Sequence, residues 1–382
     1  MSIEKIVCVP DSFKGSATAA QAAAALAAGA RQVFPRADIV ELPFADGGEG
    51  TLDALLAVWG REAETVQVVD ALGRGRTARF GRSADGATAI LEAAEGNGLP
   101  HVSDVEPQPL LADTFGVGLI ARHLLEQGVQ EILLCIGGSA STDGGLGLLA
   151  ALGARIDYDD GASSAAGYGG GRLASVRGID LGGLHPSARQ VRWRIAVDVD
   201  NPLTGPRGAA AVFGPQKGAS PADVVTLDAG LSHLADVVAA ASGADADDLR
   251  ASAGFGAAGG MPLALVPLLS AEVLPGSRLV AEAVGLDSAL ADADLVLTGE
   301  GALDTQSLGG KVVDAVRTRA PGGAAVVVIA GTVKLSAADV RAAGLTAAFS
   351  IAPGAAALEE LLAEAPRLIE DAAANACALL AR

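Results

Sequence analysis

Histidine and cysteine are scarce in this chain of 382 residues, and each shortage excludes a class of site. The four histidines have no ligand-like spacing, so neither a histidine-rich metal site nor a local Ser/His nucleophile motif has support. The three cysteines, Cys8, Cys135 and Cys377, are far apart and odd in number. This pattern favours reduced core thiols over a disulfide framework or a zinc site.

Basic clusters and long apolar runs are also missing. The 27 basic residues against 45 acidic ones give a formal charge of −18, so nucleic acid is not an expected partner. No uninterrupted apolar run reaches the ~18–20 residues that span a bilayer, and the first ten residues lack the pattern of a secretory signal. We therefore expect a cytoplasmic protein without a membrane partner. We also expect a monomer or homodimer, and the length of the chain suits two domains.

Lysine is the rarer basic residue, with only five positions among the 27. Lys14, Lys217 and Lys311 lie in stretches rich in Gly, Asp, Ser or Gln. A compact ammonium charge in such a stretch suits an anionic ligand. The alternative for each one alone is an ordinary solvated lysine.

Hydrophobic runs and turn signals alternate as in α/β proteins. The first ~60 residues indicate a β-α-β-α unit, in which Thr18 and Gln21 have the spacing of a helix capping box. Short strands without intervening helices follow over 64–96 and indicate an antiparallel meander, and clean alternation returns from about 290. We predict a Rossmann- or flavodoxin-like parallel-sheet domain built from both termini, residues 1–70 and 290–382. It is interrupted by an inserted α/β domain with a mixed sheet, residues 71–289.

Five predicted strands end in polar, glycine-containing turns, which are "PDSFKGS", "FADGGEGT", "IGGSASTDGG", "DVDNPLTG" and "TGEGALDTQS". In open parallel sheets, ligands bind at the carboxyl ends of strands, where loops meet helix N-termini. The recurrence of such turns is the main functional signal of the sequence.

The turn "IGGSASTDGG" has the chemistry of a phosphate cradle. Gly137 and Gly138 let the backbone approach a ligand, Ser139 adds a hydroxyl, and Asp143 suits either magnesium or the cap of the next helix. It is neither a Walker A loop nor a GxSxG elbow. The stretch "GFGAAG" over 254–259 matches GxGxxG but lacks a preceding strand, which disfavours a nicotinamide-dependent oxidoreductase.

Carboxylates also gather at the predicted strand ends, where they can bind magnesium or act as a general base toward a hydroxyl. Each one alone is more often a helix cap or turn residue. Together with the lysines and glycine turns, they favour phosphoryl transfer, in which positioning and charge neutralisation dominate. These acids are Asp46, Glu49, Asp198, Asp200, Glu300 and Asp304.

Six blocks now form a recognisable series: "PDSFKGS", "ADGGEGT", "IGGSASTDGG", "DVDNPLTGPRGAAAVFGPQKGA", "GAAGGM" and "TGEGALDTQSLGGK". In order and spacing they resemble the bacterial glycerate kinases of type I, which are glycerate 2-kinase-like, over nearly the whole chain. The family pattern differs at Ser141, Thr142 and Ala302, so no role is assigned to these side chains.

The resemblance implies ATP-dependent, magnesium-assisted phosphorylation of D-glycerate by a two-domain α/β protein with its active site in the cleft between the domains. It favours 2-phosphoglycerate over 3-phosphoglycerate as product. A kinase for another small hydroxy acid stays open as an alternative. A nicotinamide-dependent oxidoreductase and a non-catalytic metabolite-binding protein are more distant alternatives.

We predict Asp198 as the general base, with Asp46 or Asp304 as alternatives, and Lys14 as the residue that neutralises an anion at the reaction centre. The predicted glycerate-binding residues are Asp11, Ser12, Lys14, Gly47, Gly48 and Asp304. The predicted ATP-binding residues are Gly137, Gly138, Ser139, Lys217, Gly299, Glu300, Gly301 and Lys311, and the predicted magnesium ligands are Asp143 and Asp304.

Overall fold

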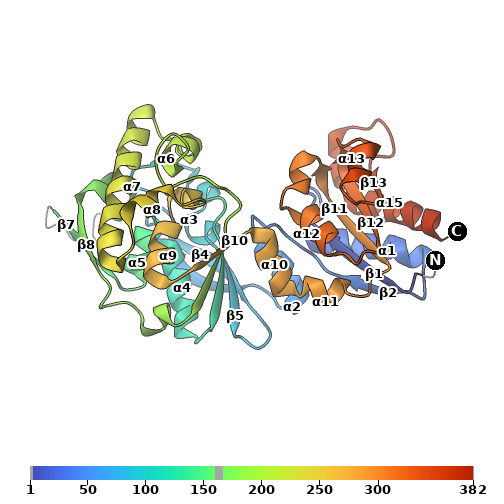
Figure 1. Ribbon diagram of the computed structural model, residues 1–382, viewed down its shortest axis with the longest axis horizontal. Helices are drawn as coiled ribbons and strands as arrows, with labels where there is room; N and C mark the ends of the chain where they lie inside the picture. Colours follow the sequence, from blue (N-terminus) through green and yellow to red (C-terminus); the bar gives the residue numbers. More distant parts are fainter. Residues whose placement is uncertain (1–2, 160–166, 382) are drawn as a thin grey trace. The chain divides into compact units, whose positions relative to one another are not determined.

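The chain forms two compact α/β units, as a computed structural model that describes residues 3–159 and 167–381 shows (Figure 1). Unit 1 comprises residues 1–46, 53–60 and 275–382, and unit 2 comprises residues 47–52 and 61–274. The predicted fold class is thereby confirmed, because a parallel-sheet unit built from both termini is interrupted by a mixed-sheet unit.

Unit 1 contains a five-stranded, fully parallel sheet in the order β13-β12-β11-β1-β2. Its central strands read as apolar runs because a parallel sheet is covered on both faces. Side chains alternate along a strand, so Ile6 and Cys8 of β1 contact one layer of helices while Val7 and Val9 face the opposite side. The strands are β1 (Lys5–Pro10), β2 (Asp38–Glu41), β11 (Leu295–Leu303), β12 (Ala325–Val333) and β13 (Ala347–Ser350).

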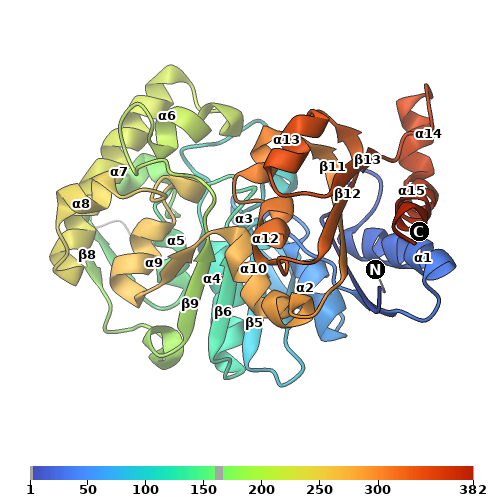
Figure 2. The same cartoon turned by 45° about the vertical axis from the view of Figure 1, so that its right-hand side comes forward.

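Two helices from opposite ends of the chain, α1 (Ala19–Val33) and α15 (Ala365–Leu380), run side by side over this sheet (Figures 1 and 2). The predicted capping box of α1 is confirmed, because Thr18 and Gln21 exchange both side-chain-to-backbone hydrogen bonds. The other helices of unit 1 are α10 (Gly276–Val284), α11 (Leu286–Leu290), α12 (Val312–Arg319), α13 (Ala337–Ala342) and α14 (Leu358–Ala363), together with most of α2 (Thr51–Trp59).

Unit 2 contains a six-stranded sheet in the order β10-β9-β6-β5-β4-β3. The first four strands in this order are parallel. Strands β4 and β3 continue the sheet antiparallel, as expected for the meander predicted over 64–96. The strands are β3 (Glu64–Val69), β4 (Gly75–Arg82), β5 (Thr88–Glu92), β6 (Glu131–Cys135), β9 (Arg192–Ala196) and β10 (Glu272–Leu274). A separate hairpin pairs β7 (Arg155–Tyr158) with β8 (Val176–Asp180).

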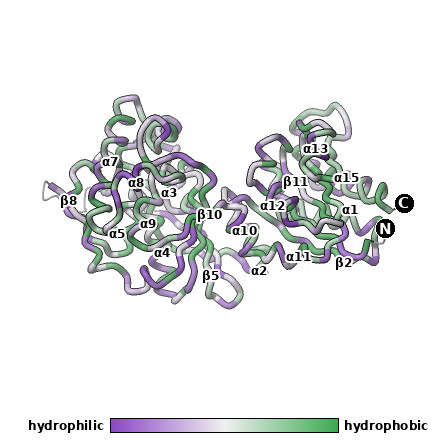
Figure 3. The backbone as a smooth tube through the Cα atoms, in the orientation of Figure 1, coloured by the Kyte–Doolittle hydropathy of each residue, from purple (hydrophilic) through white to green (hydrophobic). Residues whose placement is uncertain are grey.

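The helices of unit 2 pack their apolar sides on this sheet around Trp193, Ile132 and Ile120. They are α3 (Ala94–Asn97), α4 (Phe115–Glu126), α5 (Leu146–Ala151), α6 (Ala209–Phe213), α7 (Pro221–Ser242), α8 (Ala246–Ala251) and α9 (Pro262–Leu269). Helix α7 is the one described helix long and apolar enough to cross a membrane by composition, and its buried face belongs to the core of unit 2. Hydrophobic stretches alternate with hydrophilic ones along the backbone of each unit (Figure 3).

The boundaries of the units differ from the predicted ones near residues 70 and 290. Strand β3 belongs to unit 2 because all six of its residues pair with β4. Helices α10 and α11 belong to unit 1, where α10 contacts α12. The sequence of a helix or strand does not indicate to which domain it belongs, because this depends on the elements that it contacts in the folded chain.

Candidate functional site

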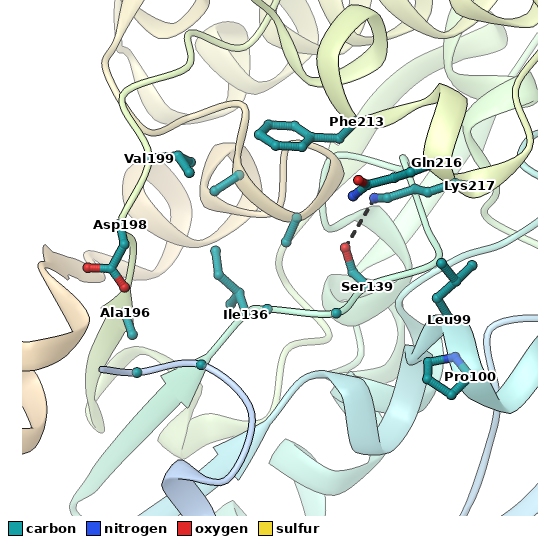
Figure 4. A pocket seen from close by; sticks show the side chains of 16 residues that line it. Leu99, Pro100, Ile136, Ser139, Ala196, Asp198, Val199, Phe213, Gln216 and Lys217 are labelled. Atoms are coloured by element: carbon teal, nitrogen blue, oxygen red, sulfur yellow. Dashed lines mark hydrogen bonds between the residues drawn. The ribbon is translucent and has the colours of Figure 1, made fainter. Parts of the chain in front are cut away.

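A cavity of about 450 Å³ lies in unit 2, at the carboxyl ends of β6 and β9 (Figure 4). Short 3₁₀ turns at Leu99–Val102, Pro215–Lys217 and Ala257–Gly259 complete its walls. This is the place where open α/β sheets bind ligands. The lining residues are Gly47, Gly48, Leu99, Pro100, Ile136, Gly137, Gly138, Ser139, Ala196, Asp198, Val199, Phe213, Gln216, Lys217, Ala257 and Ala258.

The glycine turn after β6 forms one wall of the cavity. Gly138 has a φ of +71°, a conformation that favours glycine, and its carbonyl accepts a hydrogen bond of 2.9 Å from the amide of Leu99. Ser139 pairs with Gly98 in an isolated β-bridge, so the end of the turn is held against the segment Gly98–Leu99. The structure therefore brings Gly137, Gly138 and Ser139 together at the cavity, as the sequence predicts.

Lys217 is buried at the end of its 3₁₀ turn, and its Nζ donates to the hydroxyl of Ser139 at 3.1 Å and to the carbonyl of Ser141 (Figure 4). Burial lowers the pKa of Lys217 to about 8, although the nearby charge of Asp143 acts in the opposite direction. Two of the three ammonium N–H groups are used within the protein. The side chain also lines the cavity, so its remaining N–H group suits an anionic ligand there.

Asp198 also lines the cavity and is exposed, and Figure 4 shows it on the opposite side from Lys217. The loop that carries it is held two residues further on, where Asp200 accepts two hydrogen bonds of 2.8 Å from Arg207. This ion pair lowers the pKa of Asp200. A carboxylate and an ammonium group thus face one cavity from different walls.

Asp143 has a different role from the predicted magnesium ligand. It is fully buried and outside the cavity lining, and its carboxylate accepts hydrogen bonds from the amides of Thr114, Gly145 and Gly147 and from the Thr114 hydroxyl, at 2.7–3.3 Å. Burial raises its pKa, and these hydrogen bonds oppose the rise. Asp143 therefore holds the start of α5 against the start of α4, which is the capping alternative of the sequence.

In unit 1, three neighbouring strands deliver acids to one edge of the sheet. Asp11 directly follows β1, Asp46 lies beyond β2, and Glu300 lies near the end of β11. Strand β1 is between the other two, and the three carboxylates influence one another electrostatically. Burial, and then the charge of Asp46, raise the pKa of Asp11 to about 7.

Glu300 is half-buried, and its Oε1 atom has no hydrogen-bond partner within the described ranges 3–159 and 167–381. Burial raises its pKa above the ordinary value, and Asp304 and Asp46 add to the effect. Lys14 and Lys311 are exposed near these acids and lower the pKa values of Asp11 and Glu300, respectively. The edge therefore combines half-buried carboxylates with exposed cationic side chains.

Two predicted residues at this edge have structural tasks. Asp304 caps the 3₁₀ turn Thr305–Leu308 by accepting from the amide of Gln306 at 3.0 Å, and it pairs with Lys334 at 3.4 Å. The Gln306 hydrogen bond is the main cause that lowers the pKa of Asp304. Gly299 is required by packing, because a Cβ there would lie 2.1 Å from the carbonyl oxygen of Ile329 on β12. Asp304 and Gly299 therefore each have a structural role at this edge.

The predicted residues consequently fall into two sets, one in each unit. Gly47, Gly48, Gly137, Gly138, Ser139, Asp198 and Lys217 line the cavity of unit 2. Asp11, Ser12, Lys14, Asp46, Glu300, Gly301 and Lys311 belong to unit 1. Among residues 3–159 and 167–381, no group of three or more His, Cys, Asp or Glu side chains is arranged to hold a metal ion.

The sequence did not single out the apolar part of the cavity, which includes Phe213, Leu99 and Val199. Phe213 and Gln216 lie in the Pro- and Gly-rich block after β9, so the irregularity of that block was the available signal. The GxGxxG match at 254–259 lies between α8 and α9, in turns that include Ala258 at a φ of +48°. The absence of a strand before it removes the support for a dinucleotide fingerprint.

Known proteins resemble this chain over nearly its full length. The sequence model of the glycerate kinase family matches residues 6–381. A glycerate kinase of Bacillus subtilis (strain 168) is 43% identical, with 98% of this chain and 97% of the relative covered. A glycerate 2-kinase of Escherichia coli (strain K12) is 40% identical, with 99% and 98% covered. A crystal structure of a Salmonella typhimurium LT2 protein, provisionally named glycerate kinase 2, is 39% identical, with a TM-score of 0.88 and 99% and 98% covered.

These matches define an enzyme of the kinase class, and its fold has two α/β units. The chain belongs to the glycerate kinase family. This membership confirms the resemblance in the six sequence blocks and contradicts the oxidoreductase alternative.

Proposed function

We propose that this chain transfers the γ-phosphoryl group of ATP to the 2-hydroxyl of D-glycerate, with magnesium, in the cytoplasm. The family membership supports the kinase reaction and its two substrates. The choice of the 2-hydroxyl is supported by the name of the E. coli relative, a glycerate 2-kinase at 40% identity. Phosphorylation of another small hydroxy acid is the alternative outcome of the assay below.

The observation that carries the nucleotide assignment is the buried ammonium group of Lys217 beside Ser139 and the glycine turn, in a cavity of about 450 Å³. Backbone amides and an ammonium group at a strand end suit phosphates. The apolar side chains of Phe213, Leu99 and Val199 suit the flat adenine ring. We assign this cavity to ATP.

We assign magnesium to the exposed carboxylate of Asp198 and not to a site formed by several protein ligands. Magnesium keeps several waters and binds through one or two carboxylates together with substrate phosphates. Asp198 lines the cavity, and no group of three candidate ligands exists among the described residues. Bound magnesium would neutralise phosphate charge, which a chain of charge −18 otherwise disfavours.

The hydroxy acid is assigned to the edge of the unit 1 sheet at which strands β1, β2 and β11 end. Lys14 supplies a cation for the carboxylate of glycerate or for the transferring phosphoryl group, and Ser12 supplies a hydroxyl donor. Asp198 remains a candidate proton acceptor from the sequence, and Asp11 becomes a second one through its position beside Asp46 and Glu300.

The function is tested by ADP release from MgATP in the presence of D-glycerate, coupled in parallel to enolase alone and to phosphoglycerate mutase plus enolase. Signal with enolase alone supports 2-phosphoglycerate as product. Signal only with the mutase present shows 3-phosphoglycerate instead. If glycerate does not stimulate ADP release, the substrate assignment is wrong, and a panel of other hydroxy acids in the same assay tests the alternative.

The nucleotide assignment has its own variant test. Replacing Lys217 by Met removes a hydrogen bond to a charged group, a loss of about 1.5–3 kcal/mol that corresponds to roughly ten- to a hundredfold in affinity. We expect the KM for MgATP to rise by that factor while the KM for the hydroxy acid changes less than twofold. Lys5→Met is the matched control, because Lys5 pairs with Asp292 at the start of β1. An unchanged KM for MgATP in Lys217→Met contradicts the assignment.

A further inference from the structure

The strand edge of unit 1 places one carboxylate between two others. Asp11 follows the central strand β1, while Asp46 and Glu300 come from its neighbours β2 and β11. The edge is where the proposed function locates the hydroxy acid. A group that accepts the proton of the attacking hydroxyl has to belong to this edge or reach it.

Asp11 is held in one orientation by its surroundings. Its amide donates to the carbonyl of Gly299 at 2.8 Å, which fixes the backbone against β11. Its Oδ1 atom accepts from the amide of Ser12 at 2.6 Å. Within residues 3–159 and 167–381, this amide is the only hydrogen-bond donor to the carboxylate. Oδ2 therefore keeps its lone pairs for a ligand.

The charges around Asp11 oppose its ionisation. Burial comes first, and the carboxylates of Asp46 and Glu300 add to it, whereas the Ser12 amide and the ammonium group of Lys14 oppose them. The balance raises its pKa to about 7. A general base works best when its pKa lies near the operating pH, because it is then both ionised and strong enough to take a proton.

We propose that Asp11 is the proton acceptor for the attacking hydroxyl of the hydroxy acid, and that the neighbouring carboxylate of Asp46 makes Asp11 a stronger base. The inference rests on the proposed function. Oδ2 of Asp11 takes the hydroxyl proton while the alkoxide oxygen forms a bond to the γ-phosphorus. The bond from that phosphorus to the β–γ bridging oxygen breaks, and ADP leaves with the electron pair. Asp11 then returns the proton to water.

Asp198 is less suited to this task than Asp11. It is exposed and lines the cavity assigned to ATP in unit 2. An exposed carboxylate at that position suits a phosphate-bound magnesium ion. The two acids therefore have different assignments, and their variants separate them. Asp198→Asn is expected to raise the magnesium requirement, whereas Asp11→Asn is expected to lower kcat.

The test uses the full chain and reads turnover and its pH dependence. A positioned general base contributes roughly 10²–10⁴-fold to the rate, so Asp11→Asn is expected to lose about that factor in kcat, with the KM for MgATP within threefold. In the wild type, kcat/KM is expected to rise with pH up to about 7. Nucleotide phosphate also ionises in this range, so the shift of this limb in variants is the decisive reading.

Asp46→Asn removes a negative charge that raises the pKa of Asp11, so the acidic limb should move to lower pH by half a unit or more. Glu359→Gln is the charge-matched control, since Glu359 is exposed on α14, and its profile should match the wild type. Should Asp11→Asn fail to fold, the Asp46→Asn shift still decides the matter.

Two results overturn the inference: kcat of Asp11→Asn within tenfold of the wild type, or an acidic limb that does not move in Asp46→Asn. Failure of the proposed function would give a different result, because the wild type would then release no ADP in response to D-glycerate. If the panel finds another hydroxy acid, the same variants are measured with that acid. An active wild type with an unaffected Asp11→Asn variant rejects the role of Asp11 alone.

Discussion

Asp143 shows at the scale of a residue how burial decides between two roles of one carboxylate. The sequence allows both a magnesium ligand and a helix cap, since either use places an acid in a glycine turn. In the structure its two oxygens accept four hydrogen bonds from donors on two segments, around Thr114 and around Gly145. The carboxylate is fully buried and outside the cavity lining, so we expect it to contribute to stability.

We predict that Asp143→Ala destabilises the fold by at least about 3 kcal/mol, because each buried donor that loses its acceptor costs about 1–3 kcal/mol. Urea unfolding measures this change. The matched control is Asp245→Ala, which removes an exposed cap of α8 and is expected to cost about 1 kcal/mol. A variant with unchanged stability but a raised magnesium requirement would restore the metal role.

Some of the side-chain contacts at the candidate site could be predicted from the sequence, and others could not. Ser139 and Lys217 are far apart in sequence, and both were assigned to ATP phosphates from the blocks that contain them; the structure joins them by a 3.1 Å hydrogen bond. The proton affinity of Asp11 was not predictable, because it depends on burial and on Asp46 and Glu300, which come from other strands. Apolar lining residues such as Phe213 carry no chemical signature in sequence.

At the scale of elements, local signals predicted helices and strands well. The capping box of α1 and the antiparallel pairing of β3 with β4 both follow from neighbouring residues. The packing of α1 against α15 could not be predicted, because it joins segments more than 300 residues apart in the chain. One glycine, Gly29, reveals how close these helices come. A Cβ there would lie 2.3 Å from the carbonyl oxygen of Glu370.

We predict that Gly29→Ala destabilises unit 1, although alanine is the better helix former by about 1 kcal/mol. The added methyl group would clash with the backbone of α15, and overpacking of this kind costs typically about 1–3 kcal/mol. Denaturant unfolding measures whether the free energy of unfolding falls or rises in Gly29→Ala. Ala24→Gly, at an exposed position of the same helix, is the control and isolates the propensity term. A stabilised Gly29→Ala protein would show that the two helices separate without cost.

At the scale of the whole molecule, two hydrophobic cores share no residue. One core lies between the parallel sheet of unit 1 and helices α1 and α15, and the other surrounds the mixed sheet of unit 2. The discontinuous arrangement was predictable because the rhythm of strands and helices at both ends differs from that of the middle. The predicted boundaries, near residues 70 and 290, lie 10–15 residues from the boundaries of the structure, near residues 60 and 275. The difference arises because only tertiary contacts decide to which unit β3, α10 and α11 belong.

Two separate cores and a nucleotide cavity confined to unit 2 predict unfolding in two calorimetric transitions, of which MgADP raises only one. Leu26→Ala in α1 should lower the transition of unit 1 and Ile120→Ala in α4 that of unit 2, since each deletes a fully buried side chain and costs about 2–5 kcal/mol. MgADP at 100 times its Kd should stabilise the transition lowered by Ile120→Ala by about 2.7 kcal/mol. ADP lacks the transferred phosphoryl group, so Lys14 of unit 1 has no phosphoryl oxygen to bind. Stabilisation of the transition lowered by Leu26→Ala would instead place the nucleotide on unit 1 and reverse the assignment of the two substrates.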